Sequence, residues 1–224
     1  HYIGALSTVV FSLFFLLLPA IFLGWNQNTF LLTEWWSVIN PTNSEHLIES
    51  DIGPHSLTAL IPTLLTDTDG DIEMSRNILN LNKDSAIMAL NVTRIFLVGL
   101  SLYFLKWPPF AKATSKLFQL RELAYLILLI PLIFPHQQKY AFALSIPALF
   151  YLLYFLFSTY SNKACSSKRW KLIIVLMIFS FILCTLSTDG LIGRELNLIT
   201  QHIKLVTWGT LVLIVSLVLA KPGL

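Results

Sequence analysis

The chain has 224 residues, of which 55% are hydrophobic and only 12% are charged, and its mean hydropathy is +0.71. Soluble domains have about 25% charged residues, so this composition excludes an ordinary soluble protein and indicates an integral membrane protein. The formal net charge is +3. Because it forms no basic stripe and no nucleic-acid-binding motif is present, we expect no nucleic-acid partner.

Six long apolar runs predict six membrane-spanning helices, because a helix satisfies its own backbone polar groups in lipid. Each run approaches the roughly 20 residues that a helix needs to cross the hydrocarbon core. The predicted fold class is therefore all-α: a polytopic transmembrane helix bundle, forming a single membrane domain over residues 1–224. The predicted spans are roughly Ile3–Gly24, Ala86–Leu105, Leu117–Phe134, Tyr140–Ser158, Leu172–Ser187 and Ile203–Ala220.

The distribution of lysine and arginine between the loops predicts the orientation in the membrane. Eight basic residues lie on the side of the short loops 106–116 and 159–171, and five lie on the other side. On that other side, segment 25–85 carries nine acidic residues and two basic ones. We therefore expect a multi-pass protein of the plasma (inner) membrane, with the short basic loops in the cytoplasm and segment 25–85 outside.

The long extracytoplasmic loop, 25–85, exceeds a simple connection and is predicted to contain interfacial helices. Trp35 and Trp36 belong to an apolar set that suits the membrane interface. Apolar residues recur at helical spacing through Ser56–Leu65, with Ser56 as the predicted N-cap. This stretch is predicted to be a short helix that lies at the outer surface and roofs the site, with a buried face made of Leu57, Leu60 and Leu64.

We expect no cofactor. Cys165 lies in a basic loop and Cys184 in an apolar run, so neither a disulfide nor a cysteine metal site is predicted. The turn that contains Asp67 and Asp69 lacks the glycine and the glutamate that a calcium-binding loop needs. A pair of aspartates also holds divalent metals beside sugar diphosphates, but we favour a solvated acidic turn.

A short polar hairpin, Pro135–Tyr140, separates the third predicted span from the fourth. So short a connection keeps its side chains at one membrane surface, on the same side as the long loop. Lys139 supplies a positive charge and His136 and Gln137 supply hydrogen-bond donors, a set that suits a phosphate group. The alternative is an ordinary interfacial hairpin whose lysine snorkels to the membrane surface.

Arginines supply further candidates. Arg94 lies in the outer half of the second predicted span, where a charged side chain tends to face a cavity or a partner. The alternative is a structural ion pair, for example with Glu122. Arg76 lies in the long loop and is a candidate on its charge alone. Arg121, at the cytoplasmic start of the third predicted span, is expected to snorkel rather than to act in the site.

Two motifs resemble those of the membrane glycosyltransferases of family 87. Residues 53–60 read GPHSLTAL and resemble the G-x-N/Q/H-S-L segment in the outer loop of that family. Residues 134–140 read FPHQQKY, followed by Pro147, and resemble its S/F-P-x-x-x-H/K-Y/H hairpin. The resemblance covers most of the chain in the order of its spans, although the motifs amount to about fifteen residues. The family belongs to the GT-C superfamily of polyprenol-phosphate-sugar-dependent enzymes.

The resemblance implies a transferase, often of mannose, that takes a sugar from a polyprenyl-phosphate donor to a glycan or glycolipid acceptor at the outer membrane face. It implies a catalytic aspartate in a first outer loop; the chain begins with His1, so we interpret it as the C-terminal part of a longer protein and expect that residue upstream. His55 stands where asparagine or glutamine is commoner in the family. The substrate-binding candidates are His55, Ser56, His136, Gln137 and Lys139 from the motifs, and Arg76 and Arg94 on physical grounds.

Two other functions remain open from the sequence. A flippase or transporter subunit would bind the same lipid-linked sugar without chemistry, and would be expected to have broken helices or repeated halves. A polysaccharide polymerase or ligase would also have a large outer loop, commonly with several arginines, whereas segment 25–85 has only Arg76. The resemblance favours the glycosyltransferase.

Overall fold

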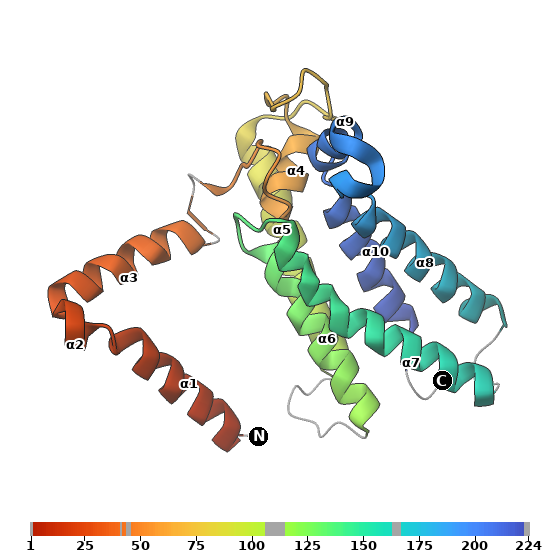
Figure 1. Cartoon of the computed structure of the whole chain (residues 1–224), viewed down its shortest axis with the longest axis horizontal. Coiled ribbons are helices and arrows are strands. Elements are labelled where there is room, and N and C mark those ends of the chain that lie inside the picture. The colour runs from red at the N-terminus through yellow and green to blue at the C-terminus, as the bar shows by residue number, and fades with distance from the viewer. Residues whose placement is uncertain (1, 41, 44–45, 106–114, 163–166, 222–224) are drawn as a thin grey trace. The chain divides into compact units, whose positions relative to one another are not determined.

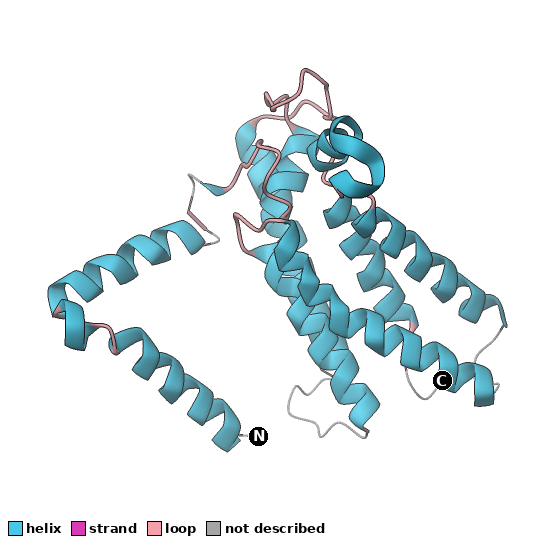
Figure 2. Cartoon of the chain, viewed as in Figure 1, coloured by secondary structure: helices cyan, strands magenta, loops and turns pink. Residues whose placement is uncertain are grey.

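The computed structural model describes residues 2–40, 42–43, 46–105, 115–162 and 167–221. Within these residues all regular structure is helical (Figure 2), which confirms the all-α part of the predicted fold class. The elements are α1 (Tyr2–Leu17), α2 (Ala20–Leu23), α3 (Trp25–Ile39), α4 (Leu57–Leu65), α5 (Lys83–Phe104), α6 (Lys116–Ile133), the 3₁₀ helix η2 (Lys139–Ser145), α7 (Ile146–Asn162), α8 (Ser167–Thr185), α9 (Asp189–His202) and α10 (Leu205–Leu219).

The chain divides into two compact units, His1–Asn43 and Ser44–Leu224. The first unit contains α1, α2 and α3. Gly24 separates α2 from α3 with φ +80°, a backbone conformation that glycine adopts without strain. Asn28 is the buried residue of α3, and its Nδ2 donates to the carbonyl of Leu16 at 3.2 Å, which joins α3 to α1.

The second unit is a bundle of long helices, in which α5, α6, α7, α8 and α10 run side by side (Figure 1). Helix α10 packs most extensively against α8 and also contacts α6 and α7. The α8–α10 approach is close at Gly209, where an added Cβ would lie 2.6 Å from Cys184 Sγ. The hydroxyl of Ser180 donates to the Gly209 carbonyl at 2.7 Å. Small residues and interhelical hydrogen bonds of this kind are typical of helix pairs in membranes.

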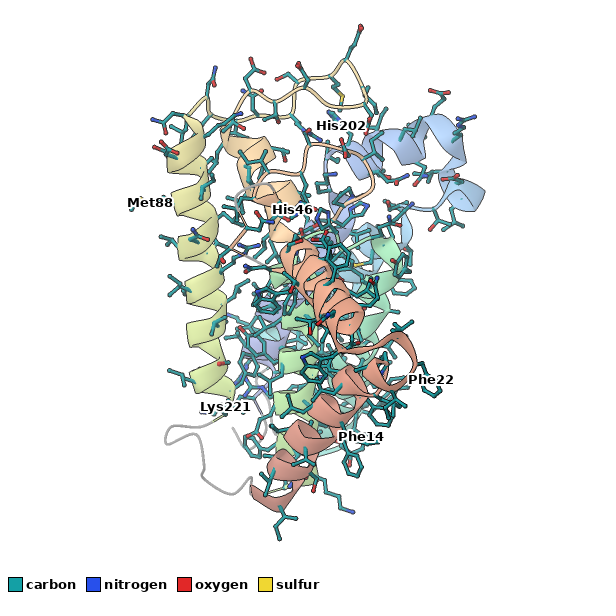
Figure 3. All side chains as sticks on the ribbon, turned by 90° about the vertical axis from the view of Figure 1, so that its left-hand side faces the viewer. Phe14, Phe22, His46, Met88, His202 and Lys221 are labelled. Atoms are coloured by element: carbon teal, nitrogen blue, oxygen red, sulfur yellow. The ribbon has the colours of Figure 1, made fainter. Side chains whose placement is uncertain are left out.

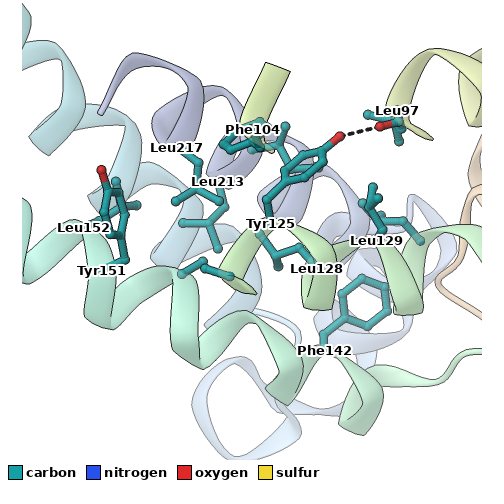
Figure 4. Close-up of a cluster of buried hydrophobic side chains, with 14 of the residues drawn as sticks. Leu97, Phe104, Tyr125, Leu128, Leu129, Phe142, Tyr151, Leu152, Leu213 and Leu217 are labelled. Atoms are coloured by element: carbon teal, nitrogen blue, oxygen red, sulfur yellow. Dashed lines mark hydrogen bonds between the residues drawn. The ribbon is translucent and has the colours of Figure 1, made fainter. Parts of the chain in front are cut away.

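The core of the bundle is apolar, with hydrogen bonds at its few polar atoms (Figure 4). The rings of Phe104 and Tyr125 stack at 3.9 Å, and the Tyr125 hydroxyl donates to the Leu97 carbonyl at 2.5 Å. Arg121 is 2% exposed rather than snorkelling: its guanidinium donates to the Leu217 carbonyl at 3.0 Å, near the end of α10. Burial is favourable there because the last carbonyls of a helix have no partner inside it.

Several described helices are long and apolar enough to cross a membrane, as a membrane protein requires. They are Ile3–Leu23, which comprises α1 and α2, Lys83–Phe104, and Lys139–Tyr160. Helices α8 and α9 add a fourth if the pair, bent by 83°, is one broken span. Two other predicted spans correspond to α6, which carries three charged residues, and to α10, which is shorter.

Two expectations are corrected. Ser56–Leu65 forms α4 as expected, and Leu57 and Leu60 are buried, but Leu64 is only partly so. Within its unit, α4 packs against α5 and α6 and buries Thr58 as well, and its place at the outer membrane surface stays a prediction. In addition, the chain continues beyond the fifth predicted span into α9, which the apolar pattern did not indicate. Gly193, at φ +77°, kinks α9.

Candidate functional site

The two motif segments lie against each other at one end of the bundle. The backbone N–H of His55, just before α4, donates to the Gln137 carbonyl in the hairpin at 2.7 Å. His55 and Ser56 are fully buried, Gln137 is partly buried, and His136 is exposed. Four of the predicted site residues are thus brought together from two segments that are far apart in the sequence.

Glu49 links the two segments, although the sequence analysis did not single it out. Its carboxylate is 5% exposed and accepts hydrogen bonds from both. The Ser56 hydroxyl donates to Oε2 at 3.0 Å, and the Thr58 hydroxyl donates to the same oxygen. From the hairpin, the backbone N–H of His136 donates to Oε1 at 2.7 Å. Because Ser56 is engaged with Glu49, it begins α4 without capping it through its side chain.

The imidazole of His136 completes this arrangement. Its Nδ1 lies 2.6 Å from Glu49 Oε1, and its side chain is 40% exposed. When Glu49 is ionised, this contact is a hydrogen bond donated by Nδ1–H, because a carboxylate can only accept. The His46 ring packs edge-on at 4.4 Å between centroids. His136 adopts φ +57°, a left-handed conformation that is uncommon outside glycine and in which histidine is several-fold enriched.

His55 is a buried neutral imidazole beneath this pair. Its ring is edge-on to Phe142 at 6.3 Å, and its two ring nitrogens have no hydrogen-bond partner among the described residues. Burial, together with the positive charges of Lys204 and Lys139, lowers the pKa of His55 from 6.5 to about 3. Its backbone carbonyl accepts a hydrogen bond from Thr207 of α10. The side chain of His55 is therefore suited to packing in the core, or to a hydrogen bond made by an uncharged imidazole.

Lys139 faces a different set of groups, at the α8–α9 junction. Its ammonium donates to the Ser187 carbonyl at 3.0 Å and to Asn197 Oδ1 at 3.4 Å. Asn197 in turn donates to Asp189. Lys139 and Asp189 both line a cavity of about 610 Å³, whose wall also includes Tyr140, Phe142, Ala143, Cys184, Ser187, Thr188, Gly190 and Val206. This cavity combines one cation and one carboxylate with an apolar wall.

The two arginine candidates contact different parts of the second unit. Arg94 is 7% exposed and donates to the Ile133 carbonyl, just before the hairpin, at 2.9 Å, and the charge of Glu49 acts on it. Arg76 donates to the carbonyls of His202 and Ser50, at 3.2 and 2.6 Å. Arg94 therefore supports the Glu49–hairpin contact.

Arg76 belongs instead to a smaller cavity, of about 250 Å³, which Lys204 and Trp208 also line. Lys204 is fully buried, and its ammonium donates to the carbonyls of Asp51 and Ile52. One signal in the sequence indicates this residue: it is a lysine at the very start of an apolar run.

The acidic turn shows no assembled metal site among the residues that the structure describes. Asp67 and Asp69 are exposed, and the carboxylate of Asp71 accepts a hydrogen bond from the Ile52 backbone at 2.6 Å. The turn thus braces the loop that precedes α4.

Comparisons with known proteins add no relative: no protein-family model, no curated protein and no solved structure matches the chain.

Proposed function

We propose that this protein is a membrane glycosyltransferase, mannosyltransferase-like, that moves a sugar from a polyprenyl-phosphate donor to a glycan or glycolipid acceptor at the outer membrane face. The observation that carries the proposal is the hydrogen bond between His55 and Gln137, reinforced by Glu49. The two segments that resemble family 87 were identified separately in the sequence, and they lie against each other in the fold, which supports the proposal.

In this proposal, the ammonium of Lys139 binds the phosphate of the donor. When the glycosidic bond breaks, the phosphate leaves with the bonding electron pair, and a nearby cation stabilises the charge that develops. Lys139 lies in the wall of the 610 Å³ cavity, where Phe142 and Val206 offer apolar surface beside it. A lipid-linked donor needs this combination of an apolar surface and a cation for its phosphate.

Lys139→Ala tests this role in the full-length protein, reconstituted with polyprenyl-phosphate mannose as donor. A charge-assisted hydrogen bond to phosphate contributes about 1.5–3 kcal/mol, so donor use should fall by roughly 10- to 150-fold. Lys139→Arg should partly restore it. The matched control is Lys168→Ala, an exposed lysine at the start of α8; Lys163, an equivalent control from the sequence, lies outside the described residues. If the folded Lys139→Ala variant uses the donor with wild-type kinetics, the hairpin has a structural role only and does not bind the donor.

The proposed membrane arrangement has six spans, with α6 and α10 completing the set and segment 25–85 outside. Arg121 and Lys204 are consistent with it, since both satisfy their charges on backbone carbonyls instead of facing lipid. In a variant without Cys165, single cysteines at Thr68 and Ser166 test the orientation; positions 165 and 166 lie outside the described residues. Labelling by an impermeant reagent on intact cells should reach position 68 and not 166, and the reverse pattern would invert the topology.

One observation favours the flippase alternative: α8 and α9 meet at 83° beside the Lys139 cavity. Broken helices that line a polar cavity are common where transporters bind their substrates. Product analysis separates the two functions. A transferase attaches labelled mannose to the acceptor, whereas a flippase moves the intact donor between leaflets and leaves its glycosidic bond unbroken.

A further inference from the structure

We propose that Asp189 is a sugar-binding residue of the Lys139 cavity, where its carboxylate accepts hydrogen bonds from hydroxyls of the donor's sugar. The inference rests on the proposed function, because it names the residue that distinguishes the sugar-bearing donor from polyprenyl phosphate without a sugar. This is a binding role, separate from that of the catalytic aspartate that the family resemblance implies. It begins from the cavity of about 610 Å³ that Lys139 and Asp189 both line.

A single side chain, that of Asn197, separates the carboxylate of Asp189 from the ammonium of Lys139. Asn197 is 3% exposed; its Oδ1 accepts a hydrogen bond from Lys139 at 3.4 Å, and its Nδ2 donates to Asp189 Oδ1. The two ends of the amide match these partners, because an ammonium can only donate and a carboxylate can only accept. Within the described part of the chain, Lys139 and Asp189 form no direct ion pair. The Asn197 amide therefore holds the two groups apart on one wall of the cavity.

The carboxylate of Asp189 has acceptor capacity left for a ligand. Asp189 is exposed, and among the described residues only its Oδ1 accepts a hydrogen bond. A carboxylate has about four lone-pair sites, so Oδ2 can accept from the hydroxyls of a sugar. Thr188, next to it in the cavity wall, begins α9 without capping it through its side chain, and a hydroxyl both donates and accepts. The α8–α9 junction thus offers the hydrogen-bonding groups that recognition of a sugar ring requires.

The cavity presents one kind of group for each part of a lipid-linked sugar. Apolar residues such as Phe142 and Val206 suit the isoprenoid chain. Lys139 suits the phosphate, and Asp189, one amide group away, suits hydroxyls of the sugar ring attached to that phosphate. A mostly apolar wall with a few placed polar groups is the usual basis of specificity in small-molecule sites. Polyprenyl phosphate without a sugar has no hydroxyls for Asp189, so this residue should favour the donor over the product.

Asp189→Asn is the sharpest test, because an oxygen remains for Asn197 while the other carboxylate oxygen becomes an amide NH₂ group. Binding of polyprenyl-phosphate mannose and of polyprenyl phosphate is measured separately, with the full-length protein in nanodiscs. The wild type should bind the mannosylated lipid more tightly. In Asp189→Asn that affinity should fall roughly tenfold, the difference between a charged and a neutral hydrogen bond. Affinity for polyprenyl phosphate should not fall, because the variant removes a negative charge close to the phosphate.

Three further variants separate recognition of the sugar from a structural role. Lys139→Ala should weaken binding of both lipids by similar factors, since both carry the phosphate. Asp189→Glu keeps a carboxylate as the acceptor and should retain more of the preference for the mannosylated lipid than Asp189→Asn does. The matched control is Glu195→Gln, which changes an exposed residue of α9 outside the cavity wall and should leave both affinities unchanged.

The outcomes distinguish this inference from the proposed function. If Asp189→Asn binds both lipids as the wild type does, or binds both more weakly by the same factor, Asp189 does not recognise the sugar, and transfer of mannose by the wild type still supports the transferase. If the preference for the mannosylated lipid is lost as expected but the wild type transfers no mannose, the proposed function is wrong. Asp189 then selects the sugar of a lipid that the protein binds without chemistry. A wild type that binds neither lipid overturns both proposals.

Discussion

The two compact units of this chain treat polar and apolar groups in opposite ways. In unit His1–Asn43, large apolar side chains are exposed along the helices, among them Phe14 at 55% and Phe22 at 83% (Figure 3). Unit Ser44–Leu224 also exposes apolar groups, such as Met88 on α5, but it buries charged ones. Among the residues of this unit that the structure describes, the buried charged ones are Glu49, Arg94, Arg121 and Lys204.

This difference indicates which positions should tolerate substitution and which should not. In lipid an exposed apolar side chain loses nothing, so many apolar residues serve equally well on α1. A buried charge is costly unless each of its hydrogen bonds is made. Glu49, Arg121 and Lys204 each make more than one hydrogen bond, so substitutions in the second unit should be the more costly ones.

The largest effect should follow from Glu49→Ala. It leaves the Ser56 and Thr58 hydroxyls and two N–H groups of His136 without their acceptor. Each buried donor left without an acceptor costs about 1–3 kcal/mol, and the loss is measured as the thermal stability of the protein in detergent. The control from the other unit is Glu34→Ala, on an exposed face of α3, which should stay within about 0.5 kcal/mol. Equal destabilisation by both would break the comparison between the units.

His55 should make the second unit sensitive to acid. Its pKa is about 3 in the folded protein and 6.5 in the unfolded chain, so between these values only the unfolded chain binds the proton. Stability is therefore lost as the pH falls below about 6.5, by about 2 kcal/mol at pH 5 at 1.36 kcal/mol for each pH unit. His55→Asn should remove this part of the pH dependence. Thermal melts of wild type and variant, recorded side by side from pH 7 to pH 4.5, measure it. The same dependence of stability on pH in both proteins would contradict the buried neutral ring.

Asn28→Ala should have a smaller effect, within the first unit. It removes the side-chain hydrogen bond to Leu16, which contributes about 1 kcal/mol. Backbone amides of α1 and α3 should then exchange with deuterium about fivefold faster, the factor that corresponds to that energy. Gln27→Ala, at the exposed neighbouring position, is the control and should leave exchange unchanged. Similar exchange in both variants would mean that the Asn28 contact does not hold α1 to α3.

The smallest effect should come from Phe14→Leu on α1. This side chain is 55% exposed, and its ring lies edge-on to that of Phe15, with 5.5 Å between the centroids. Because lipid contacts replace the lost ones, thermal stability in lipid nanodiscs should change by less than about 0.5 kcal/mol. A loss of 2 kcal/mol or more would mean that this face packs against protein.

The amino-acid sequence alone determined the helical class and the approximate places of the long helices. Apolar composition over some 20 residues is a local property, and in lipid it leaves the backbone no alternative to the helix. Helix α9 escaped this reasoning, because it is polar and contains a kink at Gly193. The burial of Thr58 in α4 escaped it as well, since the apolar spacing indicates only the leucine face.

The motif resemblance identified His55, Ser56, His136, Gln137 and Lys139 from the sequence, but it did not reveal how they divide between two sets of partners. Glu49 is one of nine acidic residues in segment 25–85, and nothing in its neighbours distinguishes it. Only the tertiary structure singles it out, through a hydrogen bond to His136 across 87 residues of sequence. The physical reason is that hydrophobicity belongs to each residue by itself, whereas a hydrogen bond requires a partner that folding alone brings into reach.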